Sequence, residues 1–417
     1  SVPEHGLKTT DAKLDPGHTV FEKLRSAGYE TAIFSENTWI TEVDVGLNQG
    51  FETVVGPQNL PFPSAVDPRQ FVATRGQGNY VAYFRETLAS DKPLRSLANG
   101  ISIKLAYDHP KLLPAVLDSK APGDVYVESF DRWRADRDSP WAACINLMDA
   151  HLPYVPKAEH DRWGGDLVRS IQDDIEEQKW SFAGGHRPWW QRRALESLYD
   201  GAIRQSDALV ADLVDRLERS GELKDTLLVI TADHGEGFGE RSHIRPIRIA
   251  EHNVAIHEVL THVPLIVKAP GQDTGKTVEE PVSISAFPGA VESVRNGEQP
   301  TFVMDDPVVS TAVGLDEPKR RRAEPYMSDL GPYTAMSRAV YEQNDDGTLL
   351  KHVTWRDEAR TVVVPDVETS FVSARTDRGR VDDVFDELSD AGITAKTGGI
   401  DEMAAGTREQ LEDLGYV

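Results

Sequence analysis

The chain has 417 residues, of which 39% are hydrophobic, so it can bury the core of one large domain and a smaller one. Its 69 acidic residues against 45 basic ones give a formal charge of -24, which repels nucleic acid and anionic membranes and excludes both as expected partners. An acidic surface in which arginine outnumbers lysine predicts a halophilic protein, since high salt would screen the self-repulsion.

The sequence shows no membrane span and no secretory pattern. No stretch approaches the roughly 20 apolar residues that cross a bilayer, and the N-terminus lacks a charged-then-apolar leader. The expected location is therefore cytoplasmic. The single cysteine, Cys144, excludes an internal disulfide, and its place in the apolar run AACINL predicts a core residue.

The first predicted elements are a helix and the strand after it. Residues 18–29 (HTVFEKLRSAGY) carry apolar residues at helical spacing and stop near Gly28, and residues 31–34 (TAIF) follow as a strand. Residues 55–130 are rich in proline and glycine and only weakly periodic, which predicts an insertion of loops and short helices.

The alternation of helices and apolar strands then continues along the chain. A buried strand is predicted at about 142–147, with His151 just past its end in the stiff turn LPYVP. A long amphipathic helix at 194–221 leads to the apolar strand 226–232 (TLLVITA), and a further strand follows in HVPLIVKAP. Alternation of this kind predicts an α/β fold, a mostly parallel sheet flanked by helices.

The last part of the chain has a different pattern. After about residue 300, the segments RAVYEQ, LLKHVTW, RTVVVP and SFVSAR predict short strands joined by polar turns, followed by the helix DDVFDELSDAG. We therefore expect an α/β domain over residues 1–310 and a small antiparallel C-terminal subdomain over residues 311–417.

The stretch TADHGEGFGE, residues 231–240, places Asp233 and His234 directly after an apolar strand. In an open parallel sheet, ligands bind beyond the carboxyl ends of the strands, where these two side chains are expected. A carboxylate and a neutral imidazole offer ligands to a divalent metal, and the glycines around them allow close approach of backbone or substrate. The alternative is a solvated loop in which the aspartate caps a helix.

Histidines crowd the region that follows. Five of the twelve lie between residues 234 and 262: His234, His243, His252, His257 and His262. Clustered imidazoles suit metal or anion chemistry, although His257 and His262 are more readily interpreted as structural residues. The rigid turn at His151 suits a side chain aimed into a crevice, and stabilisation of the turn is the alternative.

Several motifs together resemble the sulfatase family of the alkaline phosphatase superfamily. TADHGEGFGE followed by AEHNVAIHEVLTHVPLIVKAPG is similar to its Asp-His-Gly strand end, and MDAHLPYVP is similar to its His-x-Pro-Tyr turn. HTVFEKLRSAGYETAIFSEN, EEPVSISAFPGAVESV and the ending LEDLGYV resemble further family segments in the same order. The resemblance implies an alkaline-phosphatase-like fold over most of the chain.

The resemblance also implies roles for individual residues. Asp233 and His234 would bind one divalent metal ion, Ca or Mg/Mn. The expected catalytic residues are His151, which would contact the sulfate or phosphate group, and His252, which would contact the ester near its leaving oxygen. His243 is a further candidate for substrate binding, and Glu236 is expected to support the site or to lie at the surface.

One part of the family pattern is missing from this chain. The family begins with a strand carrying Asp ligands and a Cys or Ser nucleophile before x-Pro-x-Arg. Ser1 precedes Val-Pro but then Glu4 and His5, and Cys144 has no proline after it, so neither fits the motif. We therefore expect an N-terminal nucleophile-bearing segment to be missing, the chain as given to be inactive, and strand 226–232 to have an exposed edge.

The expected activity of the complete family member is metal-dependent cleavage of sulfate esters, with a small-molecule or glycan ester as substrate. A phosphodiesterase or phosphonate monoester hydrolase of the same superfamily is the alternative, since the same residues can serve a phosphate ester. A noncatalytic pseudoenzyme that only binds a ligand or a partner is the alternative from another class.

Overall fold

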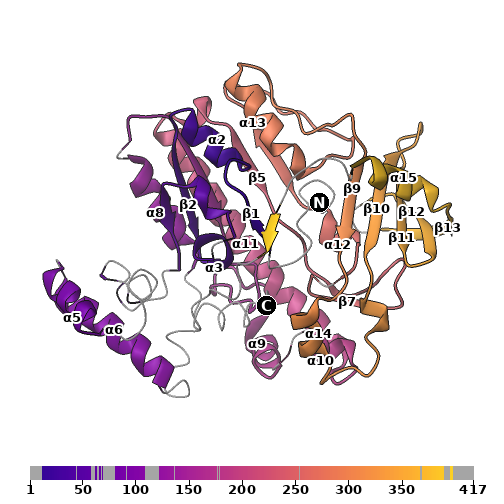
Figure 1. Ribbon diagram of the computed structural model, residues 1–417, viewed down its shortest axis with the longest axis horizontal. Coiled ribbons are helices and arrows are strands. Elements are labelled where there is room, and N and C mark those ends of the chain that lie inside the picture. Colours follow the sequence, from indigo (N-terminus) through magenta and orange to yellow (C-terminus); the bar gives the residue numbers. More distant parts are fainter. Residues whose placement is uncertain are drawn as a thin grey trace. The chain divides into compact units, whose positions relative to one another are not determined.

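The computed structural model describes residues 12–397 apart from 44, 58–61, 63–64, 67, 69–79, 91, 109–121, 136, 176, 178, 253, 367–368 and 389–394. The described residues form two compact units, one of residues 16–152 and one of residues 12–15 with 153–397 (Figure 1). Ser1, the motif SVPEHGL and the ending LEDLGYV lie outside the described residues. The expected domain boundary at residue 310 stays a prediction.

The unit of residues 16–152 contains a three-stranded parallel sheet of order β3-β2-β4. Its strands are β2 (Glu30–Ser35), β3 (Thr53–Val55) and β4 (Trp141–Asn146). Its helical elements are α2 (Val20–Ser26), α3 (Thr38–Thr41), η1 (Asn48–Gly50), α5 (Tyr80–Ala89), α6 (Pro93–Asp108) and α8 (Asp124–Ala135). The parallel pairing of the two predicted apolar strands is therefore confirmed.

Local sequence explains the helices that pack on this sheet. At the start of α2, the Thr19 hydroxyl accepts from the Glu22 amide while the Glu22 carboxylate accepts from the Thr19 amide, which satisfies two otherwise unpaired donors. Helix α8 packs on β2 and β4, and its rings Phe130 and Trp133 each lie 5.9 Å from the fully buried Phe34 ring. The predicted insertion of loops and short helices thus includes ordered helices in its described part.

The second unit is built around α11 (Trp189–Arg219), a 31-residue helix that ends just before Gly221, whose φ is +79°. The long helix predicted from the sequence is therefore confirmed, including its glycine stop. The shorter elements of this part are α9 (Gly165–Asp173), α10 (Trp180–Ala183), η2 (Leu223–Asp225), β5 (Leu228–Thr231), β6 (Phe238–Arg241), β7 (Arg248–Ala250), α12 (Glu258–Thr261), β8 (Leu265–Lys268), η3 (Ile284–Ala286) and α13 (Phe287–Arg295).

Strand β8 differs from the expectation of a parallel neighbour, because it pairs with β5 in the antiparallel direction. The chain between the two strands forms the short β6–β7 pair and the one-turn helix α12. A parallel pairing needs a longer crossover, usually through a helix that spans the sheet. Among the residues that the structure describes, β8 is the one strand paired with β5, and the expected exposed edge stays a prediction.

Residues after 307 form the predicted antiparallel sheet, of order β13-β12-β11-β10-β9, with these strands side by side in Figure 1. The strands are β9 (Val308–Ala312), β10 (Ser337–Gln343), β11 (Leu349–Trp355), β12 (Glu358–Val364) and β13 (Phe371–Arg375). The remaining elements are α14 (Glu317–Ala323), η4 (Gly331–Tyr333), α15 (Gly379–Leu388) and the pair β1 (Ala12–Leu14) with β14 (Ala395–Thr397). Among the described helices, none is both long and apolar enough to cross a bilayer.

Candidate active site

Asp233 and His234 lie just beyond the end of β5, as the sequence predicts. The Asp233 side chain is 71% exposed and that of His234 is 32% exposed. The carboxylate accepts from the His234 amide at 3.0 Å, and its other oxygen lies 3.6 Å from Nε2 of the ring. The ring Nδ1 lies 2.8 Å from the Gly235 carbonyl oxygen. Because a carbonyl can only accept, Nδ1 carries a proton, which in the neutral ring leaves the lone pair on Nε2.

The side chains of Asp233 and His234 therefore suit a shared cation. A carboxylate oxygen and an imidazole nitrogen that lie 3.6 Å apart can both contact one ion at metal–ligand distances of about 2.1 to 2.4 Å. The bond from Nδ1 to a backbone carbonyl is the arrangement that orients metal-binding histidines in proteins.

His252 lies next to His234. Their rings stack with centroids 4.2 Å apart and planes 30° apart. The antiparallel pairing of Phe238 with Ala250 brings the two stretches of chain together, and the Glu251 amide donates to the Gly237 carbonyl at 3.1 Å. Of the four residues to which the resemblance assigns metal or catalytic roles, His234 and His252 are thus in direct contact.

A buried ionic network lies under this loop. The Glu236 carboxylate accepts from the Tyr154 hydroxyl at 2.9 Å and lies 3.1 Å from the Arg192 guanidinium, which also donates to the Gly237 carbonyl. Burial raises the pKa of Glu236, although Arg192 opposes that shift. The Glu236 side chain is only 7% exposed, so its interpretation as a surface residue is wrong. The sequence signal for Arg192 is its spacing from Leu195, which places both on one helical face.

Gly235 brings the loop against helix α12. Its amide donates to the Leu260 carbonyl at 2.9 Å, and a Cβ at this position would collide with the carbonyl oxygen of Val259. The predicted close approach at this glycine is therefore real, and the partner is the chain's own backbone.

His151 follows β4 in a tight turn of the other unit. Its amide donates to the Met148 carbonyl at 3.0 Å, and its ring Nδ1 lies 2.7 Å from the Leu152 carbonyl oxygen. The turn itself is held by Asp149, which accepts from the Gly123 amide at 3.2 Å. The expected contact of His151 with the sulfate or phosphate group stays a prediction.

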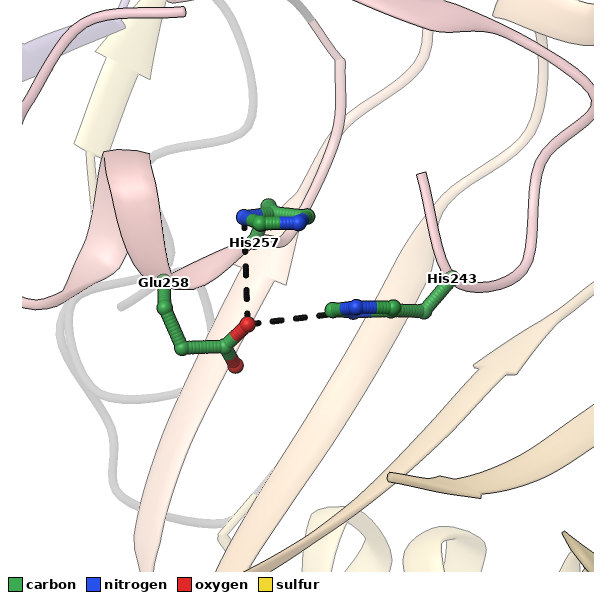
Figure 2. Close-up of side chains that lie close together, drawn as sticks. All are labelled: His243, His257 and Glu258. Carbon is green, nitrogen blue, oxygen red and sulfur yellow. Dashed lines mark ion pairs between the residues drawn. The ribbon is translucent and has the colours of Figure 1, made fainter. Parts of the chain in front are cut away.

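His243 belongs to a second, buried cluster with His257, Glu258 and Lys351. The His243 and His257 rings stack with centroids 4.4 Å apart, and one Glu258 oxygen lies 3.8 Å from Nδ1 of each. Figure 2 shows this oxygen forming an ion pair with both rings. The Lys351 ammonium, from β11, lies 2.5 Å from the other Glu258 oxygen and 3.1 Å from His243 Nδ1. Lys351 is fully buried and the Glu258 side chain is 4% exposed.

The charges of this buried cluster follow from its burial. Although burial alone would raise it, the pKa of Glu258 is held at about 2 by the Lys351 ammonium. Burial and the neighbouring Lys351 lower the pKa of His243 to about 4, so its ring is neutral at pH 7. Lys351 then donates to Nδ1 of His243, and Nε2–H donates to the Ser370 hydroxyl at 3.1 Å.

Two imidazoles and a carboxylate are also a common ligand set for Zn²⁺, and here the ligand atoms of His243, His257 and Glu258 lie within 4.8 Å of one another. The Lys351 ammonium already provides the positive charge there and uses the lone pair of His243 Nδ1. The cluster is therefore better described as a buried ion pair than as a metal centre. Both ring nitrogens of His243 are engaged, so its contacts give no support to the expected role in substrate binding.

The structural interpretation of His257 and His262 agrees with their positions at the two ends of α12. His257 Nδ1 accepts from the Val259 amide at 3.3 Å, and the His262 amide donates to the Glu258 carbonyl at 2.9 Å. The sequence did not single out Glu258 or Lys351. A signal for Lys351 exists, because strand alternation places it on the same face as Val353, a core residue.

A sequence model of the family described as Sulfatase matches residues 3–292. The chain is 26% identical over 100 residues to arylsulfatase K of Danio rerio, a match covering 24% of this chain and 18% of that protein. It is 22% identical over 184 residues to a sulfatase of Formosa agariphila, covering 39% of this chain and 34% of that protein. These matches span well under two thirds of the relatives' lengths.

Among solved structures, the chain is similar to a phosphonate monoester hydrolase of Agrobacterium radiobacter. The TM-score is 0.52 at 14% identity, and the match covers 99% of this chain and 83% of that chain. This likeness confirms the α/β fold class predicted from the sequence.

Proposed function

The chain belongs to the sulfatase family, and on that premise we propose that the loop of Asp233 and His234 forms part of the site of a sulfatase-like hydrolase. The proposed substrate is a sulfate ester of a small molecule or a glycan. The observation that carries the proposal is the contact between an exposed Asp-His pair at a strand end and the stacked ring of His252.

Asp233 and His234 would hold one divalent cation, for which calcium, magnesium and manganese are candidates. When bound, such an ion stabilises the negative charge that develops on the ester oxygens. The His234 Nε2 lone pair and the Asp233 carboxylate provide the ligands, while the bond from Nδ1 to Gly235 keeps the ring in that orientation. His252 would donate a hydrogen bond to the ester near its leaving oxygen, and His151 would contact the anionic group.

The chain as given is proposed to lack turnover. Its 417 residues contain no Cys or Ser followed by x-Pro-x-Arg, so it offers no nucleophile in the family's motif. Cleavage of a phosphate diester or a phosphonate monoester by the same residues remains the alternative activity. A noncatalytic binding protein remains the alternative from another class, and a cytoplasmic location remains part of the proposal.

Metal binding tests the proposed site directly. Mn²⁺ should bind weakly, as measured by the loss of the free Mn²⁺ signal in electron paramagnetic resonance, because two protein ligands leave most of the coordination to water. Asp233→Ala should abolish this binding. Asp225→Ala, which removes another exposed carboxylate of the same unit, is the matched control and should leave it unchanged.

An activity assay separates the alternatives. The chain and a version extended by the upstream coding sequence would be tested on aryl sulfate, aryl phosphate diester and aryl phosphonate substrates. Sulfatase turnover by the extended version alone, lost in Asp233→Ala, supports the proposal. Turnover by the short chain, also lost in Asp233→Ala, would mean that the nucleophile lies elsewhere in these 417 residues. Metal binding without turnover by either version favours the binding protein.

A further inference from the structure

Residues 254–261, which we call the bridging segment, join the candidate loop to the C-terminal sheet. Ile256 packs in one buried cluster with Ala339, Val353 and Val362 of strands β10 to β12. Val254, Ala255 and Leu260 pack in a second buried cluster with Trp180 and Tyr333. The bridging segment is therefore held by apolar contacts along most of its length.

Polar contacts fix the helical end of this segment. The Lys351 ammonium of β11 lies 2.5 Å from the carboxylate of Glu258, the first residue of α12. Tyr341 of β10 and Thr261, the last residue of α12, share a hydrogen bond of 3.0 Å between their hydroxyl groups. Apolar packing has no preferred direction, whereas a short ion pair and a hydrogen bond define where α12 lies along the sheet.

The candidate loop also contacts α12. The Gly235 amide bonds to the Leu260 carbonyl, and the backbones approach so closely that no side chain fits between them. His252 lies shortly before the bridging segment and stacks on His234. A shift of α12 would consequently move the backbone beside His234 and the chain that carries His252.

We propose that Lys351 is a positioning residue, which through Glu258 sets the placement of α12 and thereby the relative placement of Asp233, His234 and His252. This inference rests on the proposed function of that loop. It assigns the C-terminal sheet a role in the geometry of the site, although Lys351 itself contacts neither Asp233 nor the two stacked rings in any interaction described above.

The test compares the single variant Lys351→Met with the double variant Lys351→Met/Glu258→Leu. Removing one partner leaves a buried carboxylate unpaired, so the single variant is expected to lose stability. Replacing both partners by apolar side chains often restores stability, so the double variant should melt near the wild-type temperature. Lys319→Met, which removes a lysine from the more exposed ion pair with Asp316, is the matched control.

Two readouts on histidine-labelled protein then separate positioning from stability. Mn²⁺ titration broadens the NMR signals of rings close to the ion, and the metal-free ring shifts of His234 and His252 report their stacking. In the double variant we expect Mn²⁺ affinity to fall about 10-fold, as for loss of residues that orient metal ligands, together with changed ring shifts. The Lys319→Met control should match the wild type.

The outcomes also distinguish this inference from the proposed function. If the double variant recovers stability, wild-type Mn²⁺ affinity and wild-type ring shifts together, Lys351 acts through stability and the positioning role is overturned. If Mn²⁺ does not broaden His234 even in the wild type, the proposed metal role fails. Altered metal-free ring shifts in the stable double variant would still support positioning in that case.

Discussion

Two pairs of stacked histidines in one unit of this protein face opposite environments. His234 and His252 stack at 4.2 Å beside the exposed carboxylate of Asp233, whereas His243 and His257 stack at 4.4 Å beside the buried carboxylate of Glu258. The residue types are nearly the same. In the first pair a cation from solution can reach the carboxylate, and in the second the chain provides its own cation, Lys351.

This difference teaches that histidine clustering identifies a region but not its chemistry. Burial makes an unpaired charge costly, so a buried carboxylate must have a permanent partner, and Lys351 fills that position. The exposed carboxylate of Asp233 is solvated by water and needs no permanent cation, which is the condition for a reversible metal ligand.

The largest expected effect is on stability. Lys351→Met should lower the free energy of unfolding by about 3 to 5 kcal/mol, the usual cost of removing one partner from a buried ion pair. Asp233→Ala should change it by less than about 0.5 kcal/mol, as for most surface substitutions. Urea denaturation followed by tryptophan fluorescence measures both, and equal effects would remove the contrast between the regions.

The second effect concerns metal at the buried cluster. Lys351→Ala removes the internal cation and leaves the ligand atoms of His243, His257 and Glu258 in place. Zn²⁺ should then bind the folded variant. A free Zn²⁺ concentration of 100 times the dissociation constant should raise its free energy of unfolding by about 2.7 kcal/mol. A thermal shift with Zn²⁺ measures the effect. If Zn²⁺ shifts the melting temperatures of Lys351→Ala and Lys351→Ala/His243→Ala equally, the zinc binds elsewhere. If Zn²⁺ shifts the melting temperature of the wild type and His243→Ala loses that shift, the cluster is a native metal site.

The third effect is the dependence of stability on pH. The pKa of His243 is about 4 in the folded protein, below its ordinary value of 6.5, so the unfolded chain binds this proton first as the pH falls. The stability that His243 contributes is complete above pH 6.5 and is lost between pH 6.5 and 4. For Glu258, with a pKa of about 2 against 4.5, the loss falls between pH 4.5 and 2.

Unfolding free energies from pH 7 to 4 test this assignment. Each proton taken up on unfolding contributes a slope of up to about 1.4 kcal/mol per pH unit. In His243→Gln, the side chain that faces Lys351, His257 and Glu258 no longer titrates. The slope of the unfolding free energy against pH should therefore fall by the equivalent of about one proton between pH 6.5 and 4. His234→Gln is the comparison variant from the exposed region, and an identical flattening in both would contradict the prediction.

Salt should have the smallest effect on the difference in stability between the two regions. Raising KCl to molar concentration should raise the melting temperature of the whole protein, since screening weakens repulsion in a chain with charge -24. The cost of Lys351→Met should stay within about 0.5 kcal/mol across the same range, because buried pairs are screened much less. A melting temperature that stays flat or falls would contradict the halophilic interpretation.

The local sequence pattern predicted several elements of this structure. The apolar strands, the helix that stops at Gly221 and the place of Asp233 and His234 at a strand end all follow from periodicity and turn chemistry. The antiparallel direction of β8 did not follow, because direction depends on how the intervening chain packs rather than on the strand's own residues.

The sequence pattern also could not predict which distant residues pair with the buried charges. Lys351 and Glu258 are 93 residues apart, and the sequence of LLKHVTW shows only that a lysine occupies a face that should be apolar. Such a position demands a buried counter-charge without saying which acid provides it. The same holds for Arg192, whose partner Glu236 lies in a loop far along the chain.

The lone cysteine has a practical consequence for chemical labelling. Burial raises the pKa of the Cys144 thiol to about 11, so the reactive thiolate is a very minor species near neutral pH. This chain is therefore a weak background for thiol-specific reagents. A cysteine introduced at position 233 would report by its alkylation rate how open the surroundings of that carboxylate are to solution.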